Sequence, residues 1–214
     1  NMNMGACRIV YQEMTRIDVA IEDGSINENR VLLKLLGKAK ASGGAVHFMG
    51  LLSDGGVHSH ILHLFALLGL AKKHGVKAYV HAFMDGRDTS PTSGAAFVRQ
   101  LLDKMAELDH GSLASLVGRY YAMDRDKRWD RTALAWNMLT HGEGQTVDDP
   151  VRALEDAYAD GETDEFIQPR LVAPPAGAHA LLAGGGAPVF FHFRVDLPRR
   201  LPRRLCPASF SAVR

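Results

Sequence analysis

Five charged or titratable side chains in three short polar stretches have the chemistry of an anion-binding site: His58, Arg87, Asp88, Arg119 and Arg125. Arginine presents a planar, permanently charged fork that pairs with a phosphate or a carboxylate through parallel hydrogen bonds. Histidine exchanges a proton near neutral pH, and an aspartate beside an arginine stays ionised and can accept one. The set indicates a small substrate with two or more anionic groups, with Asp88 as the candidate base.

The alternative is a surface network in which these charges pair only with one another. Three further histidines, His47, His63 and His81, are expected in the core or at its rim rather than as ligands. The sequence has no HExxH pattern, no paired cysteines, and no GxSxG or Walker A pattern. We therefore expect no intrinsic metal site in this chain and neither of those catalytic or nucleotide-binding motifs.

Each polar stretch follows an apolar run of strand length. Strands are predicted at residues 45–49, 76–83 and 113–117, with helices from the end of the first polar stretch to residue 74 and from Ser93, the expected cap, to residue 105. This alternation predicts an α/β fold with a mostly parallel sheet and helices on both faces, in three layers. The carboxyl ends of parallel strands share one edge, so the five residues should converge there.

The first of these polar stretches, residues 50–60, contains the pair Gly55 and Gly56. Glycine allows a sharp turn and a close approach of the backbone to a bound group. The helix that follows begins with N–H groups that lack a partner inside the helix, and such groups favour anions. The start of this helix is therefore a second expected source of anion-binding donors.

The remaining elements define three segments. Helices are predicted at residues 9–22, at 31–39 with Asn27 as a possible cap, at 130–139 and at 148–159, and a strand at 189–193. We expect residues 1–170 to form an α/β substrate-binding domain, and residues 171–194 a linker and a returning strand of the same domain. Residues 195–214 are rich in arginine and proline and are predicted to be a disordered tail.

Composition bounds the class of protein. The 214 residues are 46% hydrophobic and 23% charged, as in ordinary globular proteins, and the net charge of +1 gives no global attraction to nucleic acid or to a membrane surface. Cys7 and Cys206 lie at opposite ends, which favours a reducing compartment. No membrane-spanning run or signal peptide is recognised. Because the chain begins with Asn1, we expect a fragment or a processed product.

Several longer motifs resemble one family. GLLSDGGVHSH, HAFMDGRDTSP and GRYYAMDRDKRWDR are similar to segments of the cofactor-independent (2,3-bisphosphoglycerate-independent) phosphoglycerate mutases, as are RIVYQEMTRID and ETDEFIQP. The similarity covers residues 4–169 and, more weakly, 189–194. It implies a glycolytic isomerase of two α/β domains that interconverts 3-phosphoglycerate and 2-phosphoglycerate. This chain resembles the inserted, substrate-binding domain, whereas a phosphatase-like domain carries two manganese ions and a nucleophilic serine.

The resemblance also implies roles for individual residues. His58, Arg87, Asp88, Arg119, Arg125 and Arg194 fall on substrate-binding positions, with Asp88 as the proton acceptor. The metal ligands and the serine lie outside the matched segments, so we expect this chain alone to be inactive. The implied protein is a cytoplasmic monomer that takes a small-molecule substrate, binds neither nucleic acid nor membrane, and relies on the missing domain for activity.

Two features depart from the family pattern. The pattern FRxDR reads FRVDL here, with Leu197 in place of an arginine, and the sequence after Asp196 resembles nothing in the family, which suggests a shifted reading frame. These departures leave open a non-catalytic phospho-anion-binding module or a degenerate fragment. A nucleic-acid contact by the arginines of residues 199–204 is the least favoured interpretation.

Overall fold

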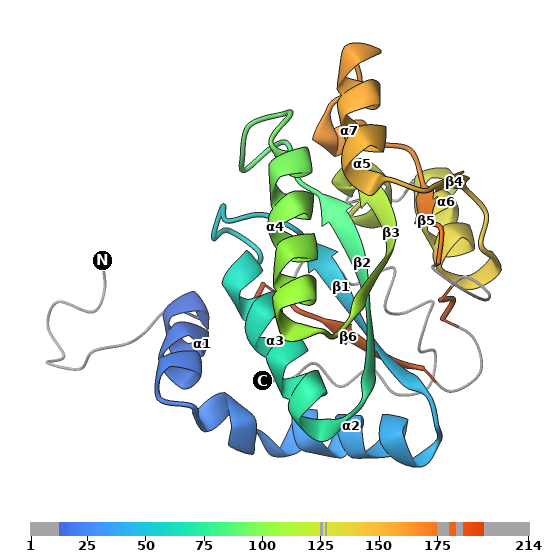
Figure 1. Cartoon of the computed structure of the whole chain (residues 1–214). Helices are drawn as coiled ribbons and strands as arrows, with labels where there is room; N and C mark the ends of the chain where they lie inside the picture. The colour runs from blue at the N-terminus through green and yellow to red at the C-terminus, as the bar shows by residue number, and fades with distance from the viewer. Residues whose placement is uncertain (1–12, 125, 127, 175–179, 183–185, 195–214) are drawn as a thin grey trace, which may run out of the picture.

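A six-stranded sheet organises the molecule (Figure 1). The computed structural model describes residues 13–124, 126, 128–174, 180–182 and 186–194. The strands are β1 (Ala45–Leu51), β2 (Lys77–Met84), β3 (Ser112–Gly118), β4 (Gln145–Val147), β5 (Arg170–Val172) and β6 (Ala187–Phe190), in the order β4-β5-β3-β2-β1-β6. All neighbours are parallel except β3 and β5. The predicted mostly parallel α/β sheet is confirmed.

Alternate residues of the central strands enter two separate cores. Val46 and Phe48 belong to one core cluster, whereas Met49 and Leu51 of the same strand belong to the other, as the period of two in a strand requires. The helices are α1 (Glu13–Glu22), α2 (Arg30–Ala41), α3 (Ile61–His74), α4 (Gly94–Leu108), α5 (Arg119–Ala122), α6 (Trp129–His141) and α7 (Pro150–Ala159). The first cluster contains residues of α2, α3, α4 and α7, and the second residues of α5 and α6. Helices therefore pack against both faces.

Helix starts differ from the predicted caps. Asn29, not Asn27, caps α2, since its side-chain oxygen accepts from the N–H groups of Val31 and Leu32 at 3.0 and 3.1 Å. Asn27 instead donates to the carbonyl of Gly24 within a short 3₁₀ helix, η1 (Ser25–Glu28). Because Asn27 belongs to η1, the cap of α2 lies two residues later than predicted, at Asn29. By contrast, the predicted end of α3 is confirmed at Gly75, whose φ of 62° needs glycine.

Two short strands were not predicted. β4 and β5 have three residues each, too few to show an alternating pattern. They pair with each other, and β5 also pairs with β3, across long sequence separations. Leu171 and Val172 belong to β5, where the sequence suggested the start of a linker. The last strand, β6, ends at Phe190 rather than residue 193. Residues 195–214, and with them the predicted disordered tail and Leu197, lie outside the described residues.

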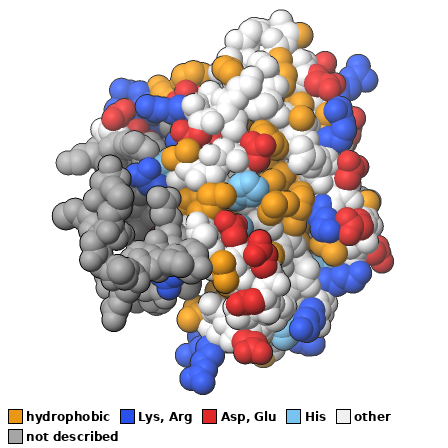
Figure 2. All heavy atoms as spheres, turned by 90° about the vertical axis from the view of Figure 1, so that its left-hand side faces the viewer, with side chains coloured by type: hydrophobic (Ala, Val, Ile, Leu, Met, Phe, Trp, Pro, Cys, Tyr) orange, Lys and Arg blue, Asp and Glu red, His pale blue; other side chains and the backbone are white. Residues whose placement is uncertain are grey.

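The surface carries charges of both signs. Figure 2 shows basic and acidic side chains interspersed with apolar ones on the side of the molecule where α1 lies. This distribution agrees with a net charge of +1. Within the described parts of the chain, no helix combines the length and the apolar character needed to cross a membrane.

Candidate functional site

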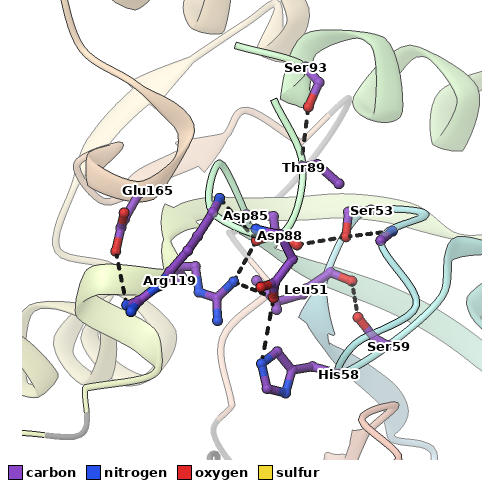
Figure 3. Close-up of polar contacts among 12 residues, drawn as sticks. Leu51, Ser53, His58, Ser59, Asp85, Asp88, Thr89, Ser93, Arg119 and Glu165 are labelled. Atoms are coloured by element: carbon purple, nitrogen blue, oxygen red, sulfur yellow. Dashed lines mark hydrogen bonds and ion pairs between the residues drawn. The ribbon is translucent and has the colours of Figure 1, made fainter. Parts of the chain in front are cut away.

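Three side chains from the ends of β2 and β3 form a buried charge cluster (Figure 3). Arg119, the first residue after β3, donates through one guanidinium nitrogen to Asp85 Oδ1 at 2.5 Å and to Asp88 Oδ2 at 2.7 Å. Asp85 and Asp88 both lie in the loop that follows β2. The side chains of Arg119 and Asp85 are almost completely buried. One cation therefore holds two carboxylates together at the carboxyl edge of the sheet.

Asp85 is the centre of this cluster, and sequence reasoning missed it. Its carboxylate accepts from the Ser53 hydroxyl at 2.8 Å and from the N–H groups of Asp88 and Arg87 at 3.0 and 3.3 Å. Burial opposes its ionisation, but the bonds from Asp88 N–H, from Ser53 and from Arg119 outweigh burial and hold the pKa of Asp85 below its ordinary value. Its position directly after a buried strand was the available signal.

His58 reaches the same cluster from the loop after β1. Its Nε2 lies 3.5 Å from Asp88 Oδ2, and its side chain is 1% exposed, whereas that of Asp88 is 20% exposed. A Cβ at Gly55 would lie 3.3 Å from Thr89 Cγ2, a tight contact, so glycine eases the approach of the two loops. Asp88 thus lies between an arginine and a histidine and is partly open to solvent. That is a suitable arrangement for a carboxylate that accepts a proton.

We refer to Ser53, His58, Asp85, Asp88 and Arg119 together as the strand-end site. For Arg119, burial favours the neutral form, but the bonds to Asp88 and Asp85 dominate and raise the pKa of its guanidinium above the ordinary value. The cation is therefore permanent. The convergence of His58, Asp88 and Arg119, expected from the strand order, is seen in the structure.

The side chain of Arg87 is separate from the buried cluster, although its backbone N–H donates to Asp85. This side chain is 63% exposed, and its Nη1 lies 3.8 Å from Glu165 Oε1. Glu165 belongs to the 3₁₀ helix η2 (Asp164–Phe166), which follows α7. Arg87 therefore offers its guanidinium at the surface, next to the strand-end site in sequence but not in the same hydrogen-bonded group.

The residues after β6 pack against the end of β1 and the loop that carries His58. The Phe193 N–H donates to the carbonyl of His58 at 2.9 Å, and His192 Nε2 accepts from the Leu51 N–H at 2.8 Å. Burial, with smaller contributions from His58 and Arg119, lowers the pKa of His192 to about 3, so this ring is neutral. Arg194 follows immediately and is exposed. Arg125 lies outside the described residues.

The N-terminus of α3 does not supply the anion donors that were expected there. The Ile61 N–H donates to the Ser53 carbonyl at 2.9 Å, and the Leu62 and His63 N–H groups donate to His60. The loop after β1 folds back and uses these groups itself. These three N–H groups are therefore already bonded and are not free to bind an anion.

The three histidines expected in the core or at its rim lie in the core. His47, His63 and His81 are all buried. His47 Nδ1 and His81 Nε2 are 3.0 Å apart, and His81 Nδ1 is 2.8 Å from Ser115 Oγ. We call His47, His81 and Ser115 the histidine chain. His63 is paired with Asp18 of α1 at 2.8 Å.

The strand-end site does not have the character of a metal site. Arg119 already neutralises one of the two carboxylates, and its guanidinium occupies the space between them. Within the described parts of the chain, no group of three or more His, Cys, Asp or Glu side chains is arranged to hold a metal ion.

The sequence of this chain is similar to those of known proteins of one family. Residues 17–214 match the family described as "BPG-independent PGAM N-terminus". The chain is 53% identical over 210 residues to a 2,3-bisphosphoglycerate-independent phosphoglycerate mutase of Nitratidesulfovibrio vulgaris (98% of this chain, 41% of the relative), and 50% identical over 201 residues to that of Lawsonia intracellularis (94% and 39%).

A solved structure supports the same assignment. The fold matches a Leishmania mexicana phosphoglycerate mutase, whose crystals were studied at low cobalt concentration, with a TM-score of 0.86 and 28% identity, over 96% of this chain and 39% of the other. This chain therefore spans about two fifths of the length of the relatives it matches. The family match over nearly the whole chain means that this protein belongs to the family of the N-terminal part of 2,3-bisphosphoglycerate-independent phosphoglycerate mutases.

Proposed function

We propose that this chain is the substrate-binding part of an enzyme that interconverts 3-phosphoglycerate and 2-phosphoglycerate. The observation that carries the proposal is the position of Asp88, held between Arg119 and His58 at the edge where Arg87 offers an exposed guanidinium. A partly open carboxylate beside a permanent cation suits proton transfer to and from a hydroxyl group. The mutase relatives support the same substrate.

In this proposal the outer arginines bind the anionic groups. The buried group contains one cation, Arg119, and two carboxylates, Asp85 and Asp88, so its formal charge is +1 − 2 = −1. A phosphate or carboxylate therefore needs further cations. Arg87 supplies one, and we assign the same task to Arg125 and Arg194 on the basis of the family resemblance.

Asp88 is proposed to act on the proton of the substrate hydroxyl that receives the phosphoryl group. Arg119 donates to the carboxylate and fixes its direction, and His58 Nε2 lies 3.5 Å from the same oxygen. Asp85 and Ser53 act indirectly, because they hold Arg119 and the loop backbone in place.

The remaining assignments follow from the family. We place the two manganese ions expected of a complete enzyme outside the residues described here, because the strand-end carboxylates are already paired with Arg119. We also propose a cytoplasmic, monomeric enzyme with a small-molecule substrate. Residues 1–170 are proposed as the substrate-binding domain and residues 171–194 as a linker and returning strand of it.

Calorimetric titration of the 214-residue chain with 3-phosphoglycerate tests the proposal. Arg87→Ala should weaken binding about tenfold, since a mostly exposed charge-assisted hydrogen bond contributes near the lower end of about 1.5–3 kcal/mol. Arg99→Ala is the matched control: Arg99 is 58% exposed and pairs with Glu155 at 3.2 Å, on α4 and α7. Asp88→Asn should retain affinity, because its task is proton transfer.

Added salt should weaken binding, because Arg87 and Arg194 are exposed to solvent. Equal affinity for 3-phosphoglycerate and inorganic sulfate, together with wild-type affinity of Arg87→Ala, contradicts the proposal. The arginines would then form a surface charge network. Tight binding without discrimination between the two phosphoglycerates and other phosphorylated acids would favour the phospho-anion-binding module.

A further inference from the structure

Residues 164–167, which the proposed function does not use, lie against two of the loops that carry the strand-end site. Gly86 has a φ of 65°, and a Cβ there would lie 2.8 Å from Asp164 Cβ and from the Glu165 N–H nitrogen. A Cβ on Gly118, just before Arg119, would collide with the Glu165 carbonyl oxygen. The Gly118 N–H also donates to the Ile167 carbonyl at 2.8 Å. The approach is too close for any residue but glycine at these two positions.

Asp164 makes the directional contacts of this segment. Its carboxylate accepts from the Gly94 N–H at 2.7 Å, and its own N–H donates to the Pro91 carbonyl at 2.8 Å. The other carboxylate oxygen accepts from the Tyr158 hydroxyl. Asp164 is 1% exposed. It therefore touches the loop of residues 85–94 at its start, through Gly86, and at its end, through Pro91 and Gly94.

The cap of α4 shows why this contact is needed. Ser93 occupies the cap position, as the sequence predicted, but its hydroxyl donates to the Ser90 carbonyl at 2.8 Å and makes no cap bond. Asp164 supplies the missing acceptor from seventy residues further along the chain. The loop is thus closed by a side chain that lies outside it.

The electrostatics of Asp164 indicate a hydrogen-bonding role. Burial is the main cause that raises the pKa of Asp164, with a contribution from Asp85, although the bonds from Tyr158 and Gly94 act in the opposite direction. Burial and the bond to Asp164 raise the pKa of Tyr158 as well. A neutral acceptor of the same shape should therefore replace the carboxylate.

We propose that Asp164 is a positioning residue of the strand-end site. It holds both ends of the 85–94 loop and so fixes Arg87 and Asp88 in the geometry that binds phosphoglycerate. The inference rests on the proposed function for its ligand. Its physical content is preorganisation: a loop held in the binding geometry pays less ordering entropy when the ligand arrives.

The test compares three variants of the 214-residue chain by titration with 3-phosphoglycerate. Asp164→Ala should weaken binding about tenfold or more, because the loop must be ordered on binding. Asp164→Asn should restore near wild-type affinity, since its amide oxygen can accept from the Gly94 N–H. Tyr158→Phe removes the hydroxyl that donates to Asp164 and accepts from the Ala95 N–H of α4 at 3.2 Å. It leaves the contacts of Asp164 with Gly86, Pro91 and Gly94 in place, so it should lower the urea midpoint and leave the affinity unchanged.

A merely structural role predicts a different pattern. If Asp164→Ala and Tyr158→Phe lower stability alike and both bind as the wild type does, the proposal is overturned. Should Asp164→Ala fail to fold, Asp164→Ser also removes the carboxylate from the Gly94 N–H while it keeps a small polar side chain, and wild-type affinity in that variant overturns the proposal equally.

Hydrogen exchange separates this inference from the proposed function. In Asp164→Ala the amides of Arg87 and Asp88, which donate to Asp85, should exchange faster than in the wild type, and in Tyr158→Phe they should not. If the wild-type chain binds no phosphoglycerate but these amides still exchange faster in Asp164→Ala, the proposed substrate is rejected and the positioning role is kept. Unchanged exchange in Asp164→Ala rejects the positioning role whatever the ligand.

Discussion

The first three strands carry two polar clusters of opposite character. In the middle of the sheet, the histidine chain takes one residue each from β1, β2 and β3: His47, His81 and Ser115. Burial lowers the pKa of His47 to about 4 and, together with His47, that of His81 to about 3. At the carboxyl ends, the strand-end site takes Ser53, Asp85 and Arg119 from the segments that directly follow the same three strands, in the same order, and it contains an ion pair.

The difference separates a structural cluster from a functional one. Neutral groups that satisfy one another tolerate burial at little cost, and the histidine chain is closed on itself within the sheet. Charges resist burial unless they are paired, and the strand-end site pairs one cation with two carboxylates, one of which remains partly exposed. Because the strand-end site has two carboxylates for one arginine, and because Asp88 is partly exposed, this cluster can interact with a ligand.

Among single substitutions, removal of Arg119 should have the largest effect. Arg119→Met leaves Asp85 buried without its ionic partner, and we expect a loss of about 3–5 kcal/mol in the free energy of unfolding. Urea denaturation measures it. The triple variant Arg119→Met with Asp85→Asn and Asp88→Asn should recover much of the loss. A loss below about 1 kcal/mol in the single variant would mean that solvent, not Arg119, stabilises the carboxylates.

Acidification should weaken the neutral cluster first. In the unfolded chain His47, His81 and His192 bind protons below about pH 6.5, but in the folded chain they stay neutral until about pH 4 or 3. The unfolded state therefore takes up more protons, and stability falls as pH drops from 6.5 toward 4. Asp85, with its lowered pKa, adds a further loss only below its unfolded value of 3.8.

The expected slope is about 1.4 kcal/mol per pH unit for each of the three histidines at its steepest. Unfolding free energies measured between pH 7 and pH 4.5 give it directly. The double variant His47→Gln and His81→Gln should lose most of this slope, whereas His141→Gln, at an exposed position, should keep it. A wild-type profile that is flat across this range would show that the histidines are charged in the folded chain.

Breaking the histidine chain should cost less than removing Arg119. His81→Leu leaves His47 Nδ1 and Ser115 Oγ without their partner, which we expect to lower stability by about 1–3 kcal/mol. Because the histidine chain lies within the strands and not at their carboxyl ends, the affinity for 3-phosphoglycerate should remain that of the wild type. Reduced affinity in a folded His81→Leu protein would mean that the two clusters are coupled through the strands.

Sequence reasoning identified the edge of the sheet but not the bonds within it. Alternating apolar runs and polar turns located β1, β2 and β3, and parallel topology then brought His58, Asp88 and Arg119 together. Asp85 was overlooked because a lone aspartate after a strand is indistinguishable from an ordinary turn residue. Its role depends on Ser53, thirty-two residues earlier, which no local pattern reveals.

The contacts of Arg87 and Asp164 join residues that are still further apart in the sequence. The sequence grouped Arg87 with the converging residues, but its direction is set by where Glu165 lies after α7. Asp164 caps α4 across seventy residues, so the local signal pointed to Ser93. Tertiary contacts, not propensities, decided both, and three-residue strands such as β5 were hidden for the same reason.

The pairing of β6 with β1 has a consequence for the newly made protein. Residues 46–49 of β1 bond to residues 187–190, and β6 is the outermost strand on that side. During synthesis at about 5–20 residues per second, β1 is complete roughly 7–28 s before β6 leaves the ribosome. Throughout that interval the edge of β1 that later pairs with β6 has no partner. Because β1 is largely apolar and is buried in the folded protein, this edge is a template for aggregation. Translation speed and chaperone access in this window should therefore govern the yield of soluble chain.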